Sequence, residues 1–145
     1  MPTYATESTP EAHDDALICN AARFETHRPQ PSAAVVAAHG ELDAANCHQF
    51  IDFALRSGDQ TKRLVVDLTG LSFFATAGFS ALHTLNVRCA GDDIRWALVP
   101  SQAVDRLLRL CDPDSALPIC EDTASALTAV HTDSPDLLQL IPETG

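Results

Sequence analysis

The chain has 145 residues, of which 46% are hydrophobic and 20% charged, and its formal net charge is -11. This length and composition suit one globular domain that buries a core without metal or disulfide staples. The excess of acid argues against binding to nucleic acid or to an anionic membrane, because both repel negative charge. It suits a partner with a basic surface, and it equally suits simple solubility.

Hydropathy and cysteine usage indicate a cytoplasmic protein. No apolar run approaches the roughly 20 residues of a transmembrane helix, and the N-terminus lacks the basic and apolar regions of a signal peptide. The five cysteines are odd in number and form no C-x-x-C pair, which argues against a disulfide framework or a zinc site. We expect buried apolar thiols. A redox pair is the alternative, and Cys89 and Cys111 are its candidates because each ends a predicted helix.

The polar, proline-containing stretches at the two ends predict tails over residues 1–14, which we expect to be disordered, and 132–145, with one domain over 15–131. Within the domain we predict a strand over 16–24, a loop over 25–31 that contains two prolines, and a second strand over 32–38. The short loop favours an antiparallel pair.

A helix follows the segment Gly40-Glu41-Leu42-Asp43. Asp43 or Asn46 can cap it, and Gly58 ends it. Its apolar stripe has the spacing i, i+3, i+4, i+7, i+8 and consists of Cys47, Phe50, Ile51, Ala54 and Leu55. Phe53 lies off this stripe, which places it at the edge of the core or on the surface.

The aliphatic run over 62–68 predicts a central strand that is covered on both faces. A loop and a helix over 79–90 follow it, and Leu82, Leu85 and Cys89 form the buried stripe of that helix. Thr76 stands where an N-cap belongs, ahead of Ala77. Gly78 lies in the first turn, where a missing side chain lets another molecule approach the backbone. Free N–H groups at such a helix start can hold a phosphate.

The C-terminal part continues the alternation of strands and helices. We predict a buried strand over 94–99, a helix capped by Ser101, a short strand over 117–120, and a last helix opened by Asp122 or Thr123. On the last helix we expect Ala124, Leu127 and Val130 to face inward. The order β-β-α-β-α-β-α-β-α indicates an α/β domain with a mostly parallel central sheet, an antiparallel N-terminal strand pair and about four helices.

Two stretches resemble signatures of STAS domains, in particular those of the bacterial anti-sigma factor antagonists (anti-anti-sigma factors). One is Gly-Glu-Leu-Asp at 40–43; the other is the stretch from Asp67 to Gly78. In the family the second stretch reads Asp-Ser-Ser-Gly or Asp-Ser-Thr-Gly, and its first hydroxyl residue is phosphorylated. By this resemblance the phosphoacceptor falls on Thr76, the acid on Ala75, the second hydroxyl residue on Ala77 and the glycine on Gly78. The resemblance runs from about residue 15 to 131 and implies the STAS fold.

The resemblance further implies a regulatory protein that sequesters an anti-sigma factor, of the serine/threonine kinase type, and so frees a sigma factor. Phosphorylation of Thr76 would break the complex. The implied partner surface consists of Asp43, Ala75, Thr76, Ala77, Gly78 and Phe79. Two alternatives stay open: Asp43 is only a helix cap, and Phe79 is a core residue. So do a constitutive antagonist and control by another kinase or by thiol oxidation, because Ala75 and Ala77 replace polar family residues.

A second class of function is a STAS-type ligand or redox sensor module that is not phosphorylated at the central loop. A pocket lined by Phe73, Phe74 and Trp96 would favour it, although we first expect these three aromatic residues in the core. The chain has no nucleotide-binding or hydrolase motif, and its six histidines show no H-x-H or H-x-x-x-H spacing. We therefore expect no enzyme, no metal and no cofactor. The sequence leaves the oligomeric state open.

Overall fold

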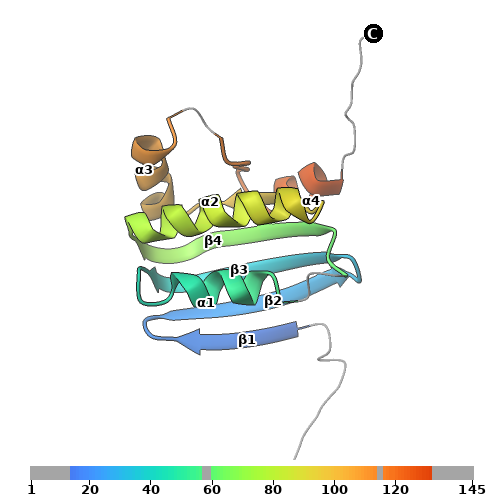
Figure 1. Ribbon diagram of the computed structural model, residues 1–145, viewed down its shortest axis with the longest axis horizontal. Helices are drawn as coiled ribbons and strands as arrows, with labels where there is room; N and C mark the ends of the chain where they lie inside the picture. Colours follow the sequence, from blue (N-terminus) through green and yellow to red (C-terminus); the bar gives the residue numbers. More distant parts are fainter. Residues whose placement is uncertain (1–13, 57–59, 114–115, 132–145) are drawn as a thin grey trace, which may run out of the picture.

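A five-stranded mixed sheet organises the protein in a computed structural model that describes residues 14–56, 60–113 and 116–131 (Figure 1). The strand order is β1-β2-β3-β4-β5; β1 to β3 are antiparallel, and β3 to β5 are parallel. The strands are β1 (Asp14–Cys19), β2 (Ala22–Gln30), β3 (Ala33–Leu42), β4 (Arg63–Phe74) and β5 (Arg95–Val99). The helices of the described ranges are α1 (Cys47–Ala54), α2 (Thr76–Gly91), α3 (Gln102–Cys111) and α4 (Thr123–His131). The predicted α/β class is confirmed.

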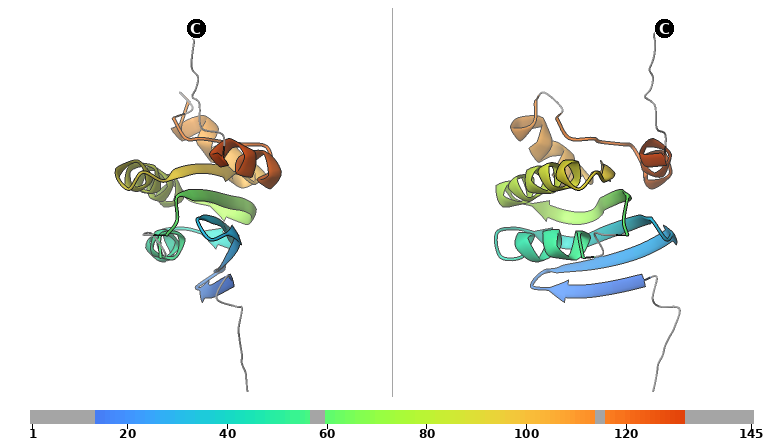
Figure 2. Two further views of the ribbon diagram at one scale, coloured as in Figure 1. Left: turned by 90° about the vertical axis from the view of Figure 1, so that its right-hand side faces the viewer. Right: turned by 45° about the vertical axis from the view of Figure 1, so that its right-hand side comes forward.

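The helices cover the two faces of the sheet unequally. Helices α1 and α2 lie on one face, and α4 lies on the other (Figure 2). The larger core lies under α1 and α2 and includes Phe24, Phe50 and Leu82. A smaller core joins α4 to β4 and β5 through Val65, Ala97, Val99, Ala126 and Val130. Strand β4 is therefore covered on both faces over its aliphatic run at 64–68, as predicted, although β3 is the middle strand.

The N-terminal region differs from the prediction. The expected first strand over 16–24 is a hairpin, in which β1 turns into β2 at Asn20, a residue with a φ of 56°. The expected loop over 25–31 is most of β2. Pro29 is tolerated there because β1 pairs no further than His27 and the β2–β3 register breaks between His27 and Gln30. Both predicted tails lie outside the described residues, except for Asp14, which begins β1. Gly58, which was predicted to end the first helix, also lies outside them.

Strand β4 extends to Phe74, so most of the loop predicted after Leu68 is strand. This end of β4 pairs irregularly with β3, with register shifts between Ala37 and His39 and between Gly40 and Glu41. Gly40 has a φ of 94°, and a Cβ there would lie 2.2 Å from the carbonyl oxygen of Ala21. The signature glycine thus permits the close approach of β3 to the β1–β2 turn.

The helices agree with the prediction except in detail. Phe53, expected at the core edge or the surface, is buried. Its ring packs against that of Phe24, with the two ring centroids 5.8 Å apart. Ser101 caps α3 by accepting from the Val104 N–H at 3.3 Å, and Asp122 accepts from the Ser125 N–H at 2.7 Å at the start of α4. On α4 it is Ala126 that is buried, whereas Ala124 is exposed. The strand predicted over 117–120 is a single bridge to β5.

Candidate partner-binding site

The two signature stretches meet where the parallel strands β3 and β4 end. Leu42 pairs with Phe74 in the strand register, and the N–H of Ala75 donates to the carbonyl of Leu42 at 3.0 Å. Asp43 directly follows Leu42, and Ala75 directly follows Phe74. The structure therefore brings the loop of Asp43 next to the start of α2, as the resemblance implied.

The sequence predicted Thr76 as the N-cap of α2, but Thr76 is the first residue of the helix. The N-cap is Ala75, whose extended backbone has a φ of -85° and a ψ of 168° but whose side chain has no oxygen. Thr76 is exposed, and its hydroxyl makes no hydrogen bond to any other described residue. The start of α2 thus presents an unengaged hydroxyl beside N–H groups that no side chain caps.

Gly78 has a different role from the one the sequence suggested. It is buried, and a Cβ there would lie 2.5 Å from the Phe74 ring. The missing side chain makes room for this ring and not for another molecule. Phe74, the last residue of β4, thereby fixes where α2 begins relative to the sheet.

Asp43 and Asn46 shape the loop after β3 together. The Asp43 carboxylate accepts from the Ala45 N–H, and the Asp43 N–H donates to Asn46 Oδ1, both at 2.9 Å. Asn46 is fully buried, and its amide group donates to the carbonyls of Glu41 at 2.9 Å and Cys19 at 3.4 Å. Asn46 makes no side-chain cap to α1 and instead ties this loop to the end of β1.

Two phenylalanines near the site are placed differently. Phe79 is half-buried against the larger core. Phe73, read from the sequence as a core aromatic, is 49% exposed at the end of β4. Neighbouring residues of a strand face opposite sides, so the pair Phe73-Phe74 could not both be buried unless both faces were covered there. That signal was present in the sequence, and it makes Phe73 an additional candidate for the partner surface.

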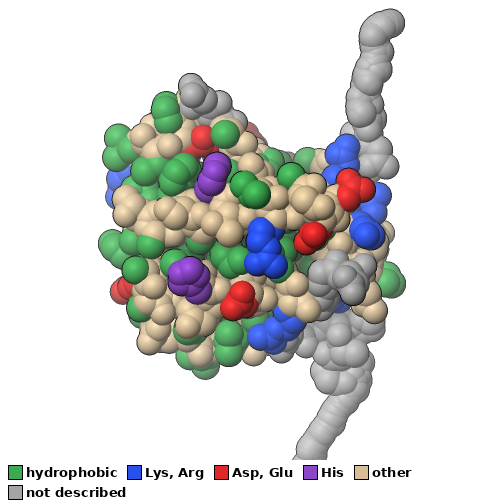
Figure 3. Space-filling view, viewed as in Figure 1, with side chains coloured by type: hydrophobic (Ala, Val, Ile, Leu, Met, Phe, Trp, Pro, Cys, Tyr) green, Lys and Arg blue, Asp and Glu red, His purple; other side chains and the backbone are tan. Residues whose placement is uncertain are grey.

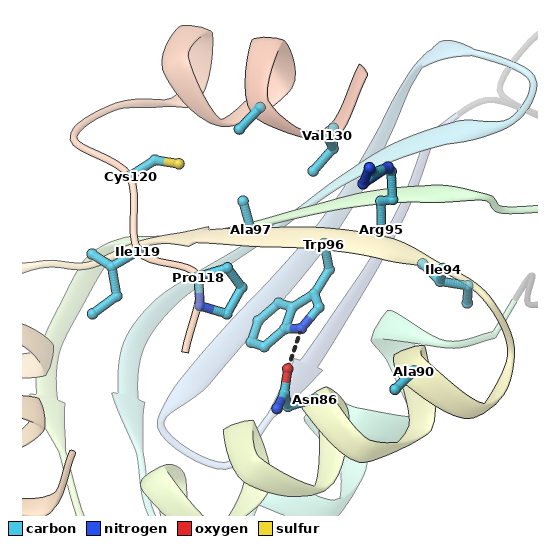
Figure 4. Close-up of a pocket in the computed structure, with 11 residues that line it drawn as sticks. Asn86, Ala90, Ile94, Arg95, Trp96, Ala97, Pro118, Ile119, Cys120 and Val130 are labelled. Carbon is cyan, nitrogen blue, oxygen red and sulfur yellow. Dashed lines mark hydrogen bonds between the residues drawn. The ribbon is translucent and has the colours of Figure 1, made fainter. Parts of the chain in front are cut away.

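The three aromatic residues that would favour a ligand sensor do not line one hollow beside Trp96. A hollow of about 440 Å³ does lie beside β5, with Trp96 and Asn86 on one side of the strand and Val130 on the other (Figure 4). However, Phe73 and Phe74 do not line it. The Trp96 indole N–H donates to Asn86 Oδ1 at 2.8 Å, so its polar atom is already satisfied within the chain.

The candidate redox cysteines differ in environment. Cys89 is fully buried in α2, and burial, assisted by the charge of Asp92, raises the pKa of its thiol to about 12. Cys111 is partly exposed at the end of α3. Both are free thiols. Because the thiolate is the reactive species, the environment of Cys89 disfavours the redox pair that its helix-end position suggested.

Over 14–56, 60–113 and 116–131, no group of three or more His, Cys, Asp or Glu side chains could hold a metal ion. No described helix has the length and apolar character needed to cross a membrane.

Comparison with known proteins defines the class. The family model of the STAS domain matches residues 26–126, and the chain belongs to this family. It is 35% identical over 102 residues to the anti-sigma-F factor antagonist RsfA of Mycobacterium tuberculosis, covering 68% of this chain and 80% of the relative. It is 38% identical over 99 residues to osmosensory protein A of the same species, covering 66% of this chain but only 63% of that relative's length.

Solved structures agree with the fold. An anti-sigma factor antagonist from Mycobacterium paratuberculosis superimposes with a TM-score of 0.65 at 22% identity, over 86% of this chain and 98% of that one. At this identity the likeness concerns the fold alone.

Proposed function

We propose that this protein is an anti-sigma factor antagonist, which sequesters an anti-sigma factor in the cytoplasm and so releases a sigma factor for transcription. The observation that carries the proposal is the meeting of Asp43 with the uncapped, exposed start of α2, in a chain 35% identical to RsfA. Its partner is an anti-sigma factor of the serine/threonine kinase type. Its role is to bind, not to catalyse.

The same geometry supports a switch at Thr76. A phosphate there adds about -1.5 to -2 charges at an exposed position, and the positive end of α2 tolerates it. The free domain therefore keeps its fold, while a partner that has desolvated this surface is repelled. Because Ala75 and Ala77 replace polar residues of the family signature, this proposal has two variants: phosphorylation by another kinase, or no phosphorylation at all. The sensor alternative has less support, because the hollow at Trp96 is lined by neither Phe73 nor Phe74.

The test is binding of the full chain to each anti-sigma factor of the same cell, in reducing buffer. We expect the unmodified protein to bind one of them and Thr76→Glu to lose that binding. Thr128→Glu is the matched control, because it makes the same change on α4, on the opposite face of the sheet. If Thr76→Glu binds as well as wild type, the antagonist role stands and the switch lies elsewhere. If the wild type binds no anti-sigma factor, the proposed function is wrong.

A further inference from the structure

A groove lies between α1 and α2, on the face that Figure 3 shows. Its volume is about 360 Å³. Figure 3 shows hydrophobic side chains in the band between the two helices, with charged and histidine side chains around them. The floor contains Cys47, Ile51 and Ala81, which are each at most 8% exposed.

The groove is continuous with the candidate site. Ala44 and Ala77 line one end of it, and they directly follow Asp43 and Thr76 in the chain. Along α2 the lining continues through Ser80 and Thr84 to Arg88. At 1.5 Å per residue, the eleven steps from Ala77 to Arg88 span about 16 Å, or three helical turns. A partner that covers Thr76 therefore has a channel leading away from it.

The far end of the groove carries one charge of each sign. Asp52 lines it from α1 and Arg88 lines it from α2, and both are exposed. Neither forms an ion pair with another described residue. A channel with an apolar floor and polar sides, which begins at the candidate site and ends at two opposite charges, matches an amphipathic helix. Such a helix offers apolar side chains at i, i+3, i+4 and i+7 and charges on its flanks.

We propose that the groove between α1 and α2 receives an amphipathic helix of the anti-sigma factor, with an acidic side chain facing Arg88 and a basic one facing Asp52. This inference rests on the proposed function. It adds that recognition extends about three turns beyond Thr76 and that partner choice is made at Asp52 and Arg88, where complementary charge selects among candidate helices.

The experiment fills the groove and measures affinity for the anti-sigma factor that the wild type binds. Ser80→Trp and Thr84→Trp each place a large ring in the hollow from an exposed position, so the fold is preserved. We expect at least about thirtyfold weaker binding, the loss typical of a blocked interface centre. Ala124→Trp is the matched control, because it adds a ring at an exposed position on α4 and is expected to bind as wild type does.

A second pair of variants tests the charged end without adding bulk. Arg88→Glu is expected to weaken binding about tenfold at low salt, with a smaller loss at high salt, because exposed charges are screened. Arg106→Glu on α3 makes the same change away from the groove and is expected to have no effect.

The outcomes separate this inference from the proposed function. If the wild type binds an anti-sigma factor and both tryptophan variants bind it equally well, the groove proposal is wrong and the antagonist role stands. If the wild type binds none, both are wrong. If the tryptophan variants instead dissociate a self-assembled form of this protein, seen by analytical ultracentrifugation, the groove serves a second copy and the helix proposal is wrong.

Discussion

Helices α2 and α3 begin with the same backbone geometry but differ in how side chains cap their first turns. Each follows a parallel strand of the sheet, and the residue before each helix has an extended backbone: Ala75 with a ψ of 168° and Ser101 with a ψ of 177°. Ser101 accepts from the Val104 N–H, and Asp105 adds an acid to the first turn of α3. Ala75 accepts nothing through its side chain, and the first turn of α2 has no acid.

The difference is that no side chain caps the start of α2, whereas the Ser101 hydroxyl caps the start of α3. A missing N-cap of this kind costs about 1 kcal/mol. The start of α2 is held instead by packing, because Gly78 closes over the buried ring of Phe74. Helix α2 therefore keeps its position without a side-chain cap, and of its first N–H groups that of Gly78 donates to the carbonyl of Ala75 at 2.8 Å.

The largest expected effect tests this packing. Gly78→Ala puts a Cβ 2.5 Å from the Phe74 ring, and we expect a loss of about 1–3 kcal/mol in the free energy of unfolding. Gly91→Ala, at the other end of α2, is the matched control: its Cβ meets nothing within 4 Å, and it is expected to stabilise by up to about 1 kcal/mol. Urea denaturation measures both.

A double variant separates a clash from a general intolerance of change. Phe74→Leu replaces the ring with a smaller side chain, so Gly78→Ala should cost less in that background than in the wild type. Equal costs in the two backgrounds would contradict the packing account of the start of α2.

An exchange of caps has a smaller expected effect. Ser101→Ala should destabilise the protein by about 1 kcal/mol, whereas Ala75→Ser should stabilise it by a similar amount, because the backbone at Ala75 already has the geometry of an N-cap. Thermal unfolding measures both. We expect Ala75→Ser also to weaken binding of the anti-sigma factor, since its hydroxyl competes for the N–H groups. Unchanged affinity together with increased stability would show that the partner does not use these groups.

The sequence predicted the elements that periodicity controls. The aliphatic run of β4 and the apolar stripes of α1 and α2 were confirmed, because burial on one or both faces selects these residues directly. The errors fell where tertiary contacts override local signals. Pro29 suggested a loop, but it lies in a strand at a position where the neighbouring strands do not need its N–H. Asp43 or Asn46 was predicted to cap α1; Asn46 stands at the N-cap position, but its buried amide group makes no cap hydrogen bond and donates to the carbonyls of Cys19 and Glu41.

The candidate site was predictable in outline and not in geometry. The two signatures gave Asp43 and Thr76, and the parallel pairing of β3 and β4 brings their loops together. The shift of the cap from Thr76 to Ala75 depends on the exact end of β4, which residue preferences do not define. The groove between α1 and α2 could not be predicted, because it depends on how two helices pack.

The smallest expected effect concerns the start of α4. The capping side chain there, Asp122, can ionise, whereas Ser101, which caps α3, cannot. Hydrogen bonds from the Ser125 N–H and hydroxyl lower the pKa of the Asp122 carboxyl from its usual 3.8. A carboxyl whose pKa is lower in the folded state stabilises the fold above its unfolded pKa, and this stability is lost as the pH falls through the folded pKa. The stability difference between wild type and Asp122→Asn should therefore shrink from about pH 5 to about pH 2. The difference between wild type and Ser101→Ala should stay constant over the same range, because serine does not ionise. Urea denaturation across this pH series measures both differences. If the stability of Asp122→Asn runs parallel to that of the wild type over the whole pH range, the Asp122 carboxylate contributes nothing to the start of α4.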